Sequence, residues 1–216
     1  MFIISITLII FTAGQGNAMI KLPEPKFTYQ SIEECMKNRR SIRNFKDQAL
    51  SLNELSNILW AAQGITKEET GFRTAPSAGA TYPLYIYYAT EQGLFVYLPK
   101  GHAIKKIKDK DIRKKIARVA FNQMFIADAG IVIVITAIFE NTTNRYGERG
   151  VRYVYNEVGH CAQNIHLEAV ALGLGSVPVG AYHDDELKEL LELDKEEPLY
   201  IIPVGYPKEQ TPGTKN

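Results

Sequence analysis

The stretch "ERGVRYVYNEVGHCAQNIHLEAVAL", residues 148–172, predicts one long helix. Apolar residues recur along it near the spacing of a single helical face. They are Val151, Val154, Val158, Cys161, Ile165 and Leu172. Gly173 and Gly175 follow directly, and glycine commonly ends a helix because it tolerates the left-handed conformation. The stretch therefore predicts a long amphipathic helix with a glycine turn at its end.

Two residues near the middle of this helix are unusual for an apolar face. Glu157 is acidic, and Gly159 costs roughly 1 kcal/mol relative to alanine inside a helix. Close packing against something flat would explain the glycine. Gln163 and Asn164 are amides that are either solvated or directed at a partner. A ligand or a second chain against this helix is one interpretation, and a solvated polar face is the other.

Apolar and aromatic runs elsewhere predict strands. Residues 130–139, "GIVIVITAIF", form a continuous run with many β-branched residues, which indicates a central buried strand. Residues 84–99 read as a β-hairpin about a Glu-Gln-Gly turn. Residues 173–182 turn into another buried strand, and residues 198–207 form the last one. No βαβαβ rhythm links them, so the pattern favours an α+β layer fold.

Shorter helices are predicted from their end signals. Ser31 with Glu34 and Ser51 with Glu54 are capping boxes, opening helices that end near Asn38 and at Gly64. Residues 110–120 and 122–129 are also predicted to be helical. A further helix, capped by Asp184 or Asp185, is expected to run to Leu191. Residues 70–83, rich in Gly, Pro, Ser and Thr, are expected to be loop.

Composition excludes several classes of function. The 216 residues carry a net charge of only +1, so no global field favours nucleic acid or an anionic membrane. Cys35 and Cys161 do not make a disulfide framework. His160 and His166 are six residues apart, which is not the spacing of a metal pair on one helical face. One domain is expected, without a metal centre.

The first 18 residues are expected to lie outside that domain. Residues 2–11, "FIISITLIIF", are too short for a stable membrane span but fit the core of a signal peptide. Gly16 and Ala18 suit a cleavage site after Ala18, although no Lys or Arg precedes the run. Translation from Met19 is the alternative. The chain is then exported in the first case and cytoplasmic in the second, with residues 19–216 as a single domain in both.

The stretch "KNRRSIRNFKD", residues 37–47, could bind an anion. Arg39, Arg40, Ser41 and Arg43 supply guanidinium and hydroxyl donors, which suit a phosphate. Cations at the carboxyl end of a helix also stabilise its dipole, so capping is the alternative. The loop "RTAPSAGATYP", residues 73–83, is small enough for a planar ligand to approach its backbone. An ordinary surface loop is the alternative there.

Four segments together carry a resemblance. "RRSIRNF", "APSAGATYP", "YGERGVRYVYNEVGHCAQNIHLEAVALGLGSVPVGAY" and "IIPVGYPK" follow one another in this order. In order and spacing they resemble the nitroreductase family of flavoproteins, and most of all its branch of azoline-oxidase-type dehydrogenases, related to thiazole- and oxazole-forming enzymes. The resemblance covers nearly all of the chain after about Leu22.

The resemblance implies a fold, a cofactor and a set of site residues. The fold is a central, mostly antiparallel sheet flanked by helices, in a homodimer with an FMN at each end of the interface. The R-x-S-x-R segment grips the FMN phosphate, the P-S-A-G segment lies against the ring, and the long helix and its glycine turn line the cofactor. The residues so assigned are Arg39, Arg40, Ser41 and Arg43, then Pro76, Ser77, Ala78 and Gly79, then Glu157, Gly159, Gly173, Leu174 and Gly175, with Lys208 completing the phosphate site.

The implied activity is that of an FMN-dependent oxidoreductase. We hypothesise ping-pong turnover, with hydride passing from NAD(P)H or an organic donor through the flavin N5 to a nitro compound, a quinone or a similar acceptor. A backbone N–H near Gly159 or Ser77 could hydrogen-bond the flavin edge. Two alternatives stay open: an azoline dehydrogenase acting in peptide modification, and a flavin-binding protein without turnover.

Two departures from the family pattern affect the chemistry. Many nitroreductases have an Asn where this chain has Ala80. Azoline oxidases resemble one another in a Lys-Tyr pair that here reads Arg145-Tyr146. Arginine stays protonated and cannot replace a lysine base, so Tyr146 is the remaining candidate catalytic acid or base. Arg149 and Arg152 could bind the cofactor, an anionic substrate or a partner subunit, or form ion pairs on a solvated helix start.

Overall fold

The computed structural model describes residues 19–208, and the predicted signal segment lies outside them. A seven-stranded sheet with the order β1-β6-β5-β4-β7-β9-β8 forms the centre of the molecule. Every pairing between these named strands is antiparallel. The sheet strands are β1 (Met19–Lys21), β4 (Leu84–Thr90), β5 (Gly93–Leu98), β6 (Ala103–Lys108), β7 (Ile131–Ala137), β8 (Gly175–Ser176) and β9 (Glu197–Gly205). Strands β2 (Ile65–Lys67) and β3 (Phe72–Arg73) pair separately.

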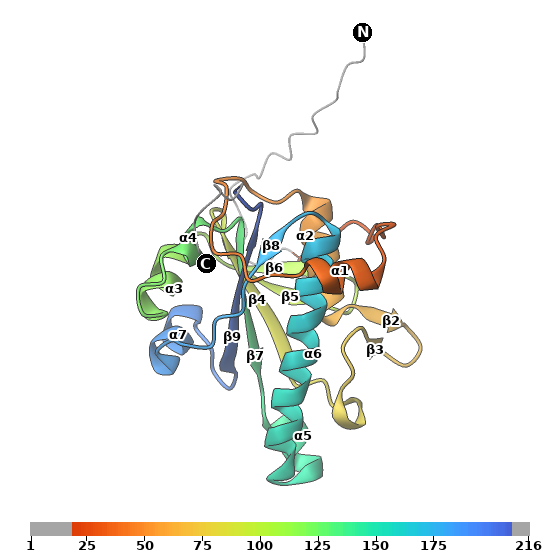
Figure 1. The fold of residues 1–216 in the computed structure, drawn as a ribbon. Helices are drawn as coiled ribbons and strands as arrows, with labels where there is room; N and C mark the ends of the chain where they lie inside the picture. The colour runs from red at the N-terminus through yellow and green to blue at the C-terminus, as the bar shows by residue number, and fades with distance from the viewer. Residues whose placement is uncertain (1–18, 209–216) are drawn as a thin grey trace.

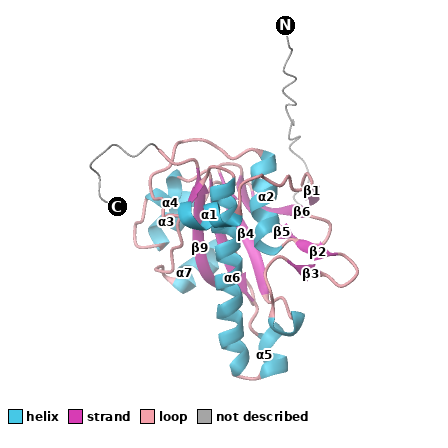
Figure 2. Cartoon of the chain, turned by 45° about the vertical axis from the view of Figure 1, so that its right-hand side comes forward, coloured by secondary structure: helices cyan, strands magenta, loops and turns pink. Residues whose placement is uncertain are grey.

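Helices cover both faces of the sheet (Figure 1). The long helix α6 lies on one face with α2 and α1, and α3, α4 and α7 lie on the other. The helices are α1 (Ile32–Asn38), α2 (Leu52–Gln63), α3 (Arg113–Val119), α4 (Phe125–Asp128), α5 (Glu140–Tyr146), α6 (Arg149–Ala171) and α7 (Asp184–Leu191), with a short 3-10 turn at Ala78–Ala80. Figure 2 shows this arrangement from a second direction. The predicted α+β fold is confirmed.

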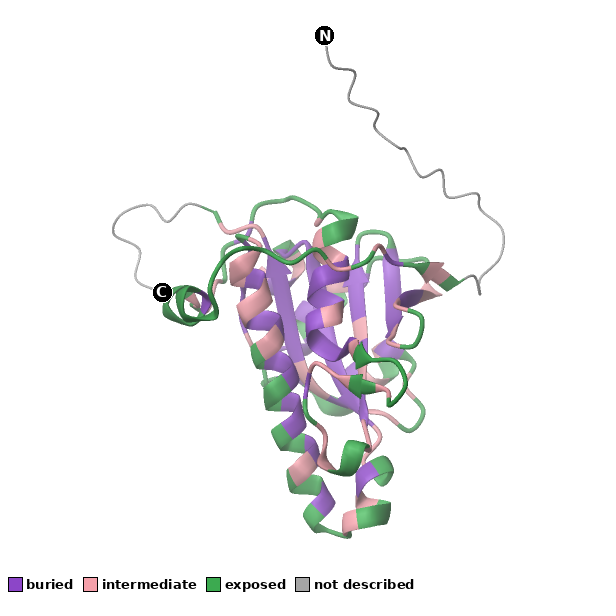
Figure 3. Ribbon diagram, turned by 90° about the vertical axis from the view of Figure 1, so that its right-hand side faces the viewer, coloured by how far each residue is buried: buried purple, intermediate pink, exposed green. Residues whose placement is uncertain are grey.

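The strand β7 is buried throughout and almost entirely apolar because it is covered on both faces. Side chains alternate between the faces of a strand. Ile131, Ile133 and Ile135 enter the core beneath α6 and α2. Val132 and Val134 enter the core beneath α3 and α7. Figure 3 shows the sheet as the most continuously buried part of the molecule. The continuous run therefore predicted the central strand correctly.

The helix predicted from residues 148–172 is α6. Val154, Val158, Cys161 and Ile165 are buried against the sheet, as their spacing requires. Val151 is an exception, since 40% of its surface is exposed near the start of the helix. Gly173 has φ of +72°, so the glycine turn ends α6 as expected.

Most predicted helix ends are confirmed, with one correction. Both capping boxes form, and Gly64 ends α2. Gly64 is not left-handed, however, with φ of −62°; a Cβ there would overlap Trp60. The predicted cap of α7 is wrong. His183 occupies the cap position without a side-chain cap bond, and Asp184 and Asp185 lie in the first turn.

Several elements were not predicted. Strand β6 was missed because three of its six residues are lysines. These lysines are half-exposed at the outer part of the sheet and hide the alternating apolar pattern of a strand. Helix α5 has only one buried residue, Thr142, and so it lacks an apolar face. Residues 70–83 contain the short strand β3, which was expected to be loop. Strand β8 is only two residues long, and after it Val179 makes an isolated bridge to Ile201.

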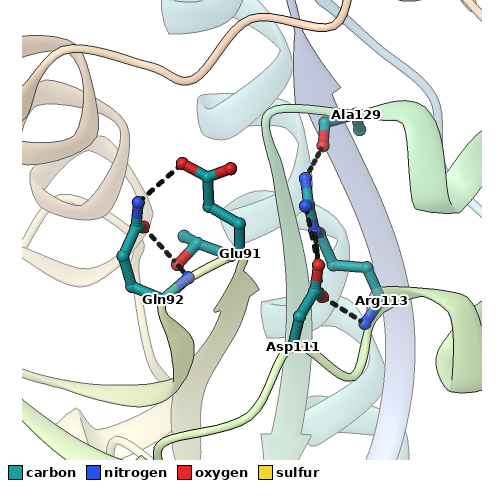
Figure 4. A network of polar contacts seen from close by, with 6 residues as sticks. Glu91, Gln92, Asp111, Arg113 and Ala129 are labelled. Carbon is teal, nitrogen blue, oxygen red and sulfur yellow. Dashed lines mark hydrogen bonds and ion pairs between the residues drawn. The ribbon is translucent and has the colours of Figure 1, made fainter.

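A polar contact joins the start of α3 to Ala129, the residue that ends α4 (Figure 4). Arg113 Nη1 donates to the Ala129 carbonyl at 2.9 Å, and Arg113 Nη2 lies 2.8 Å from Asp111 Oδ2. Asp111 Oδ1 also accepts from the Arg113 backbone N–H at 2.9 Å.

Within residues 19–208, no helix has the length and apolarity needed to cross a bilayer.

Candidate functional site

The arginine segment, defined as residues 39–46, lies between two chain segments that are distant in sequence. Ser41 bridges to Ser176 in β8, and the Ile42 N–H donates to the Ser176 carbonyl at 3.0 Å. Further along, the Lys208 N–H donates to the Asn44 carbonyl at 3.0 Å. The structure thus brings together the arginine segment, the glycine turn after α6 and Lys208. The arginine segment and Lys208 are predicted to share a phosphate site, and the glycine turn is predicted to line the cofactor.

The arginines of this segment have different surroundings. Arg40 Nη1 donates to the carbonyls of Lys37 at 2.9 Å and Arg39 at 2.7 Å. Arg40 therefore caps α1, which was the alternative to phosphate binding. The Arg43 guanidinium lies 5.9 Å from the centre of the Phe125 ring. Among the described residues Arg39 and Arg43 form no ion pair, so their charges remain uncompensated.

In the glycine turn after α6, local packing requires a glycine at position 175. A Cβ on Gly175 would lie 2.8 Å from Ile42 Cβ, so glycine is needed for the arginine segment to pair with β8. Leu174 is buried in the core with α6 and β7. Contacts of Gly173, Leu174 and Gly175 with a cofactor stay predictions.

His166 is a residue of this region that the sequence did not single out. Its Nδ1 lies 2.7 Å from Ser176 Oγ, and its Nε2 is buried without a hydrogen-bond partner among the described residues. Burial lowers the pKa of His166 to about 4, and the nearby Arg39 charge contributes. The ring is therefore neutral near pH 7. The sequence places His166 on α6, but only the structure shows that its side chain contacts Ser176 of β8.

A second group of predicted residues surrounds a cavity of about 250 Å³, called here the loop cavity. It lies between the small-residue loop, defined as residues 76–79, and α6. The lining residues are Pro76, Ser77, Ala78, Tyr153, Asn156, Glu157 and His160. Three residues of the predicted ring-binding segment and the predicted Glu157 therefore meet at one hollow. Gly159 does not line it; it is exposed, and a Cβ there would contact nothing in the described chain.

The small-residue loop has a conformation that its glycine makes possible. Gly79 has φ of +61°, and a Cβ there would lie 2.5 Å from Tyr146 Oη and 2.7 Å from Arg145 Nη1. Arg145 Nη1 donates to the Gly79 carbonyl at 3.1 Å. The Ser77 hydroxyl accepts from the Tyr82 N–H at 2.9 Å. Arg145 and Tyr146 therefore pack against the loop at Gly79 and hold it in this conformation.

Tyr146 itself is not among the residues that line the loop cavity. Its ring contacts Tyr153 edge-on, with the ring centres 5.2 Å apart, and Tyr153 does line the cavity. Tyr146 therefore positions the loop and Tyr153 in this structure. Its catalytic role stays a prediction.

Glu157 has the most unusual environment in the loop cavity. Only 2% of its surface is exposed, and its Oε1 has no hydrogen-bond partner within the described chain. Burial raises the pKa of Glu157 to about 7, while Ser77, Arg73 and Gln63 oppose the rise. Arg73 Nη1 donates to Gln63 Oε1 at 2.8 Å instead of pairing with Glu157. Gln63 and Arg73 do not line the cavity, but both influence Glu157, and the sequence did not assign this role to either of them.

A larger hollow of about 560 Å³ adjoins the loop cavity and shares Asn156 with it. Its other lining residues are Glu148, Arg149, Val151, Arg152 and Tyr155. Arg149 and Arg152 form no ion pair with any described residue. The alternative in which they pair on a solvated helix start is therefore not seen.

The two groups of site residues lie on opposite flanks of α6. His166 marks the flank of the arginine segment, and Glu157 marks the flank of the small-residue loop. With 3.6 residues per turn, their separation in sequence corresponds to about half a turn around the axis and roughly 13 Å along it. Figure 2 shows α1 beside the upper part of α6. Within one chain, the two groups therefore do not face a common space.

Comparisons with known proteins agree with this architecture. The chain is 49% identical to a provisionally assigned nitroreductase of Methanocaldococcus jannaschii, over 88% of this chain and 98% of that protein. It is 24% identical to the FMN reductase [NAD(P)H] of Bacillus subtilis, over 83% of this chain and 67% of that protein.

A crystal structure of a provisionally assigned nitroreductase from Ralstonia eutropha superposes with a TM-score of 0.82. It is 28% identical, and the match covers 91% of this chain and 93% of that one. The model of the nitroreductase family matches residues 36–206, which is most of the chain. The chain therefore belongs to the nitroreductase family of oxidoreductases.

Proposed function

We propose that the protein is an FMN-dependent oxidoreductase that transfers hydride from NAD(P)H to a small organic acceptor. The observation that carries this proposal is the loop cavity. It is lined by the same Pro76, Ser77 and Ala78 that the family resemblance assigns to the flavin ring. The name of the Bacillus subtilis relative, an NAD(P)H-dependent FMN reductase, supports the choice of both cofactors.

The residues present fit the two ends of FMN. Arg39 and Arg43, uncompensated by any described carboxylate, together with Ser41 and Lys208, suit a phosphate that carries nearly two negative charges. The small residues of the loop leave room for a flat ring, and Glu157 Oε1 is a buried acceptor without a partner. Bound FMN would supply hydride acceptance and donation at its N5 atom.

We further propose that each site is shared between two protomers. The arginine segment and the small-residue loop lie on opposite flanks of α6 in one chain, so one FMN cannot be held by both from the same protomer. A second copy, related by a two-fold axis near α6, can place its loop cavity opposite the first chain's arginine segment. Val151 and Tyr155, exposed by 40% and 55%, lie on this outer part of α6 and suit burial in such an interface.

The chain's own residues have separate tasks in this scheme. Arg39, Ser41 and Arg43 would bind the phosphate, while Arg40 fixes the end of α1 that precedes them. Arg145 and Tyr146 hold Gly79 in place, so that the loop presents a fixed surface to the ring. No side-chain nucleophile is required.

Bound flavin tests the proposal directly. Purified protein, reconstituted with FMN and desalted, is expected to keep stoichiometric FMN that NADH or NADPH bleaches under anaerobic conditions. The double variant Arg39→Ala/Arg43→Ala is expected to lose FMN while it unfolds at nearly the same denaturant concentration. Protein that stays colourless, or a double variant that retains FMN equally, would contradict the assignment.

The two alternatives predict different results in the same preparation. An azoline dehydrogenase would oxidise a thiazoline-containing peptide. Arg145 stays protonated and donates to the Gly79 carbonyl, so it cannot act as a general base for that chemistry. A flavin-binding protein without turnover would hold FMN but would not consume NAD(P)H with a quinone, a nitroaromatic compound or oxygen.

A further inference from the structure

Glu157 is the one carboxyl group among the residues that line the loop cavity. It is 2% exposed, and its Oε1 accepts no hydrogen bond from any described residue. A buried polar atom without a partner costs roughly 1–3 kcal/mol. Ser77 and Gln63 lie close enough to oppose the rise in its pKa, but no described residue makes a hydrogen bond to Oε1. A role in binding or chemistry therefore accounts for this atom better than packing does.

The groups around Glu157 leave it poised between its two protonation states. Arg73, from β3, is the cation that faces it, but the guanidinium is hydrogen-bonded to Gln63 of α2 and stacks 4.5 Å from the Tyr82 ring. Ser77 approaches from the loop. On α6 itself the titratable neighbours are Tyr153 and His160, which line the same cavity, and the buried Cys161, which feels the Glu157 charge.

A path to solvent is present on the same cavity. His160 lies one helical turn from Glu157, lines the cavity and is exposed. A proton lost from Glu157 can therefore be replaced from bulk water past His160 without opening the core.

We propose that Glu157 is the proton donor of the acceptor half-reaction, which favours acceptors that take up a proton as they are reduced, such as quinones and nitro compounds. This inference rests on the proposed function. A quinone that takes up a hydride and one proton becomes a hydroquinone; a nitro group that takes up a hydride and one proton becomes a nitroso group and water. In each case the Glu157 O–H bond breaks, a new O–H bond forms on the acceptor, and solvent reprotonates the carboxylate.

The pKa near 7 agrees with this role, since a general acid works best when its pKa is close to the working pH. Burial alone would raise the pKa of any carboxyl group; the position on the cavity is what connects the proton to a substrate.

The test compares two acceptors and two variants of the FMN-loaded protein. The reduction of menadione takes up protons, whereas ferricyanide accepts one electron and no proton. With NADH as donor and rates expressed per bound FMN, Glu157→Gln is expected to lower kcat with menadione by roughly 100-fold or more, the usual size of a general-acid effect, and to lower ferricyanide reduction by far less. Glu168→Gln is the matched control, because Glu168 lies on the same helix, accepts from Asn57 Nδ2 at 2.8 Å, and is outside the cavity.

The pH dependence supplies a second readout. The wild-type rate with menadione is expected to fall as pH rises through about 7, because Glu157 is then deprotonated, and Glu157→Gln is expected to lose this limb. Infrared difference spectra between acid and alkaline pH should show a protonated carboxyl that titrates near 7 in wild type and Glu168→Gln but not in Glu157→Gln. Glu157→Asp, which keeps the acid, should recover part of the menadione rate and covers the case in which the glutamine variant fails to fold.

The outcomes separate this inference from the function on which it rests. Wild-type protein without FMN or without NADH consumption overturns the proposed function and the inference with it. Wild-type turnover combined with equal effects of Glu157→Gln on menadione and ferricyanide, or with no effect on either, overturns the inference alone.

Discussion

At the residue scale, the two flanks of α6 each hold a buried ionisable group whose pKa burial has shifted. Glu157 is held towards its neutral, protonated form and His166 towards its neutral, unprotonated form. Neither shift could be predicted from the sequence. Helical periodicity places both residues on α6 but does not say that Ser77 will approach one and Ser176 the other.

Glu157 predicts that stability falls as pH rises. Its pKa is 4.5 in the reference state and about 7 in the folded protein, so the folded state binds more protons between these values. Folding is therefore weakened across this window, by up to about 3 kcal/mol. Urea unfolding should show Glu157→Gln gaining about that much relative to wild type between about pH 4.5 and about pH 8. A difference that does not change with pH would contradict the buried carboxyl.

His166 predicts the opposite trend at acid pH. Its pKa is 6.5 in the reference state and about 4 in the folded protein, so the unfolded chain binds the extra proton as pH falls between them. Stability present above pH 6.5 is lost towards pH 4, again by up to about 3 kcal/mol. His166→Asn can still bond Ser176 and does not titrate there. Thermal unfolding should show the acid loss in wild type and not in the variant; equal losses would contradict the assignment.

At the element scale, the longest and most regular patterns predicted the structure best. The apolar spacing of α6, the continuous β7 and the capping boxes of α1 and α2 all hold, because each depends on residues close in sequence. Strand β6 and helix α5 were missed, since the lysines of one and the exposed side chains of the other hide their period. The cap of α7 was predicted wrongly because aspartate is a common cap residue. Asp184 and Asp185 lie in the first turn instead, and His183 occupies the cap position.

The small-residue loop provides an element-scale prediction with a matched control. Gly79 and Gly101 both have positive φ, but a Cβ on Gly79 would meet Arg145 and Tyr146, whereas one on Gly101 would meet nothing. Gly101→Ala is expected to cost about 1–2 kcal/mol from backbone strain alone. Gly79→Ala should cost more and should also weaken FMN binding, because the loop must shift. Equal unfolding midpoints for the two variants, with FMN retained by both, would show that the Arg145-Tyr146 contact is unimportant.

At the scale of the whole molecule, the sequence suggested candidate site residues but not the flank of α6 on which each of them lies. The arginine segment, Gly175 and Lys208 meet because residues 41–46 pair with β8 and with the chain after β9. Residues 76–78 meet Glu157 on the other flank of α6. Which flank each segment reaches depends on strand order, and strand order is set by pairings far apart in sequence. The separation of the two groups of candidate residues is therefore a property of the fold.

The measurement that tests the central claim most directly is the FMN content of a mixed dimer. One tagged chain has Arg39→Ala and Arg43→Ala, and the other, with a different tag, has Ala78→Trp to fill the loop cavity. If each FMN is held by the arginine segment of one protomer and the loop of the other, each variant alone should bind none. The mixed dimer should then bind one FMN, because one of its two sites combines both intact halves. A mixed dimer without FMN, together with wild type that binds two, would contradict the account.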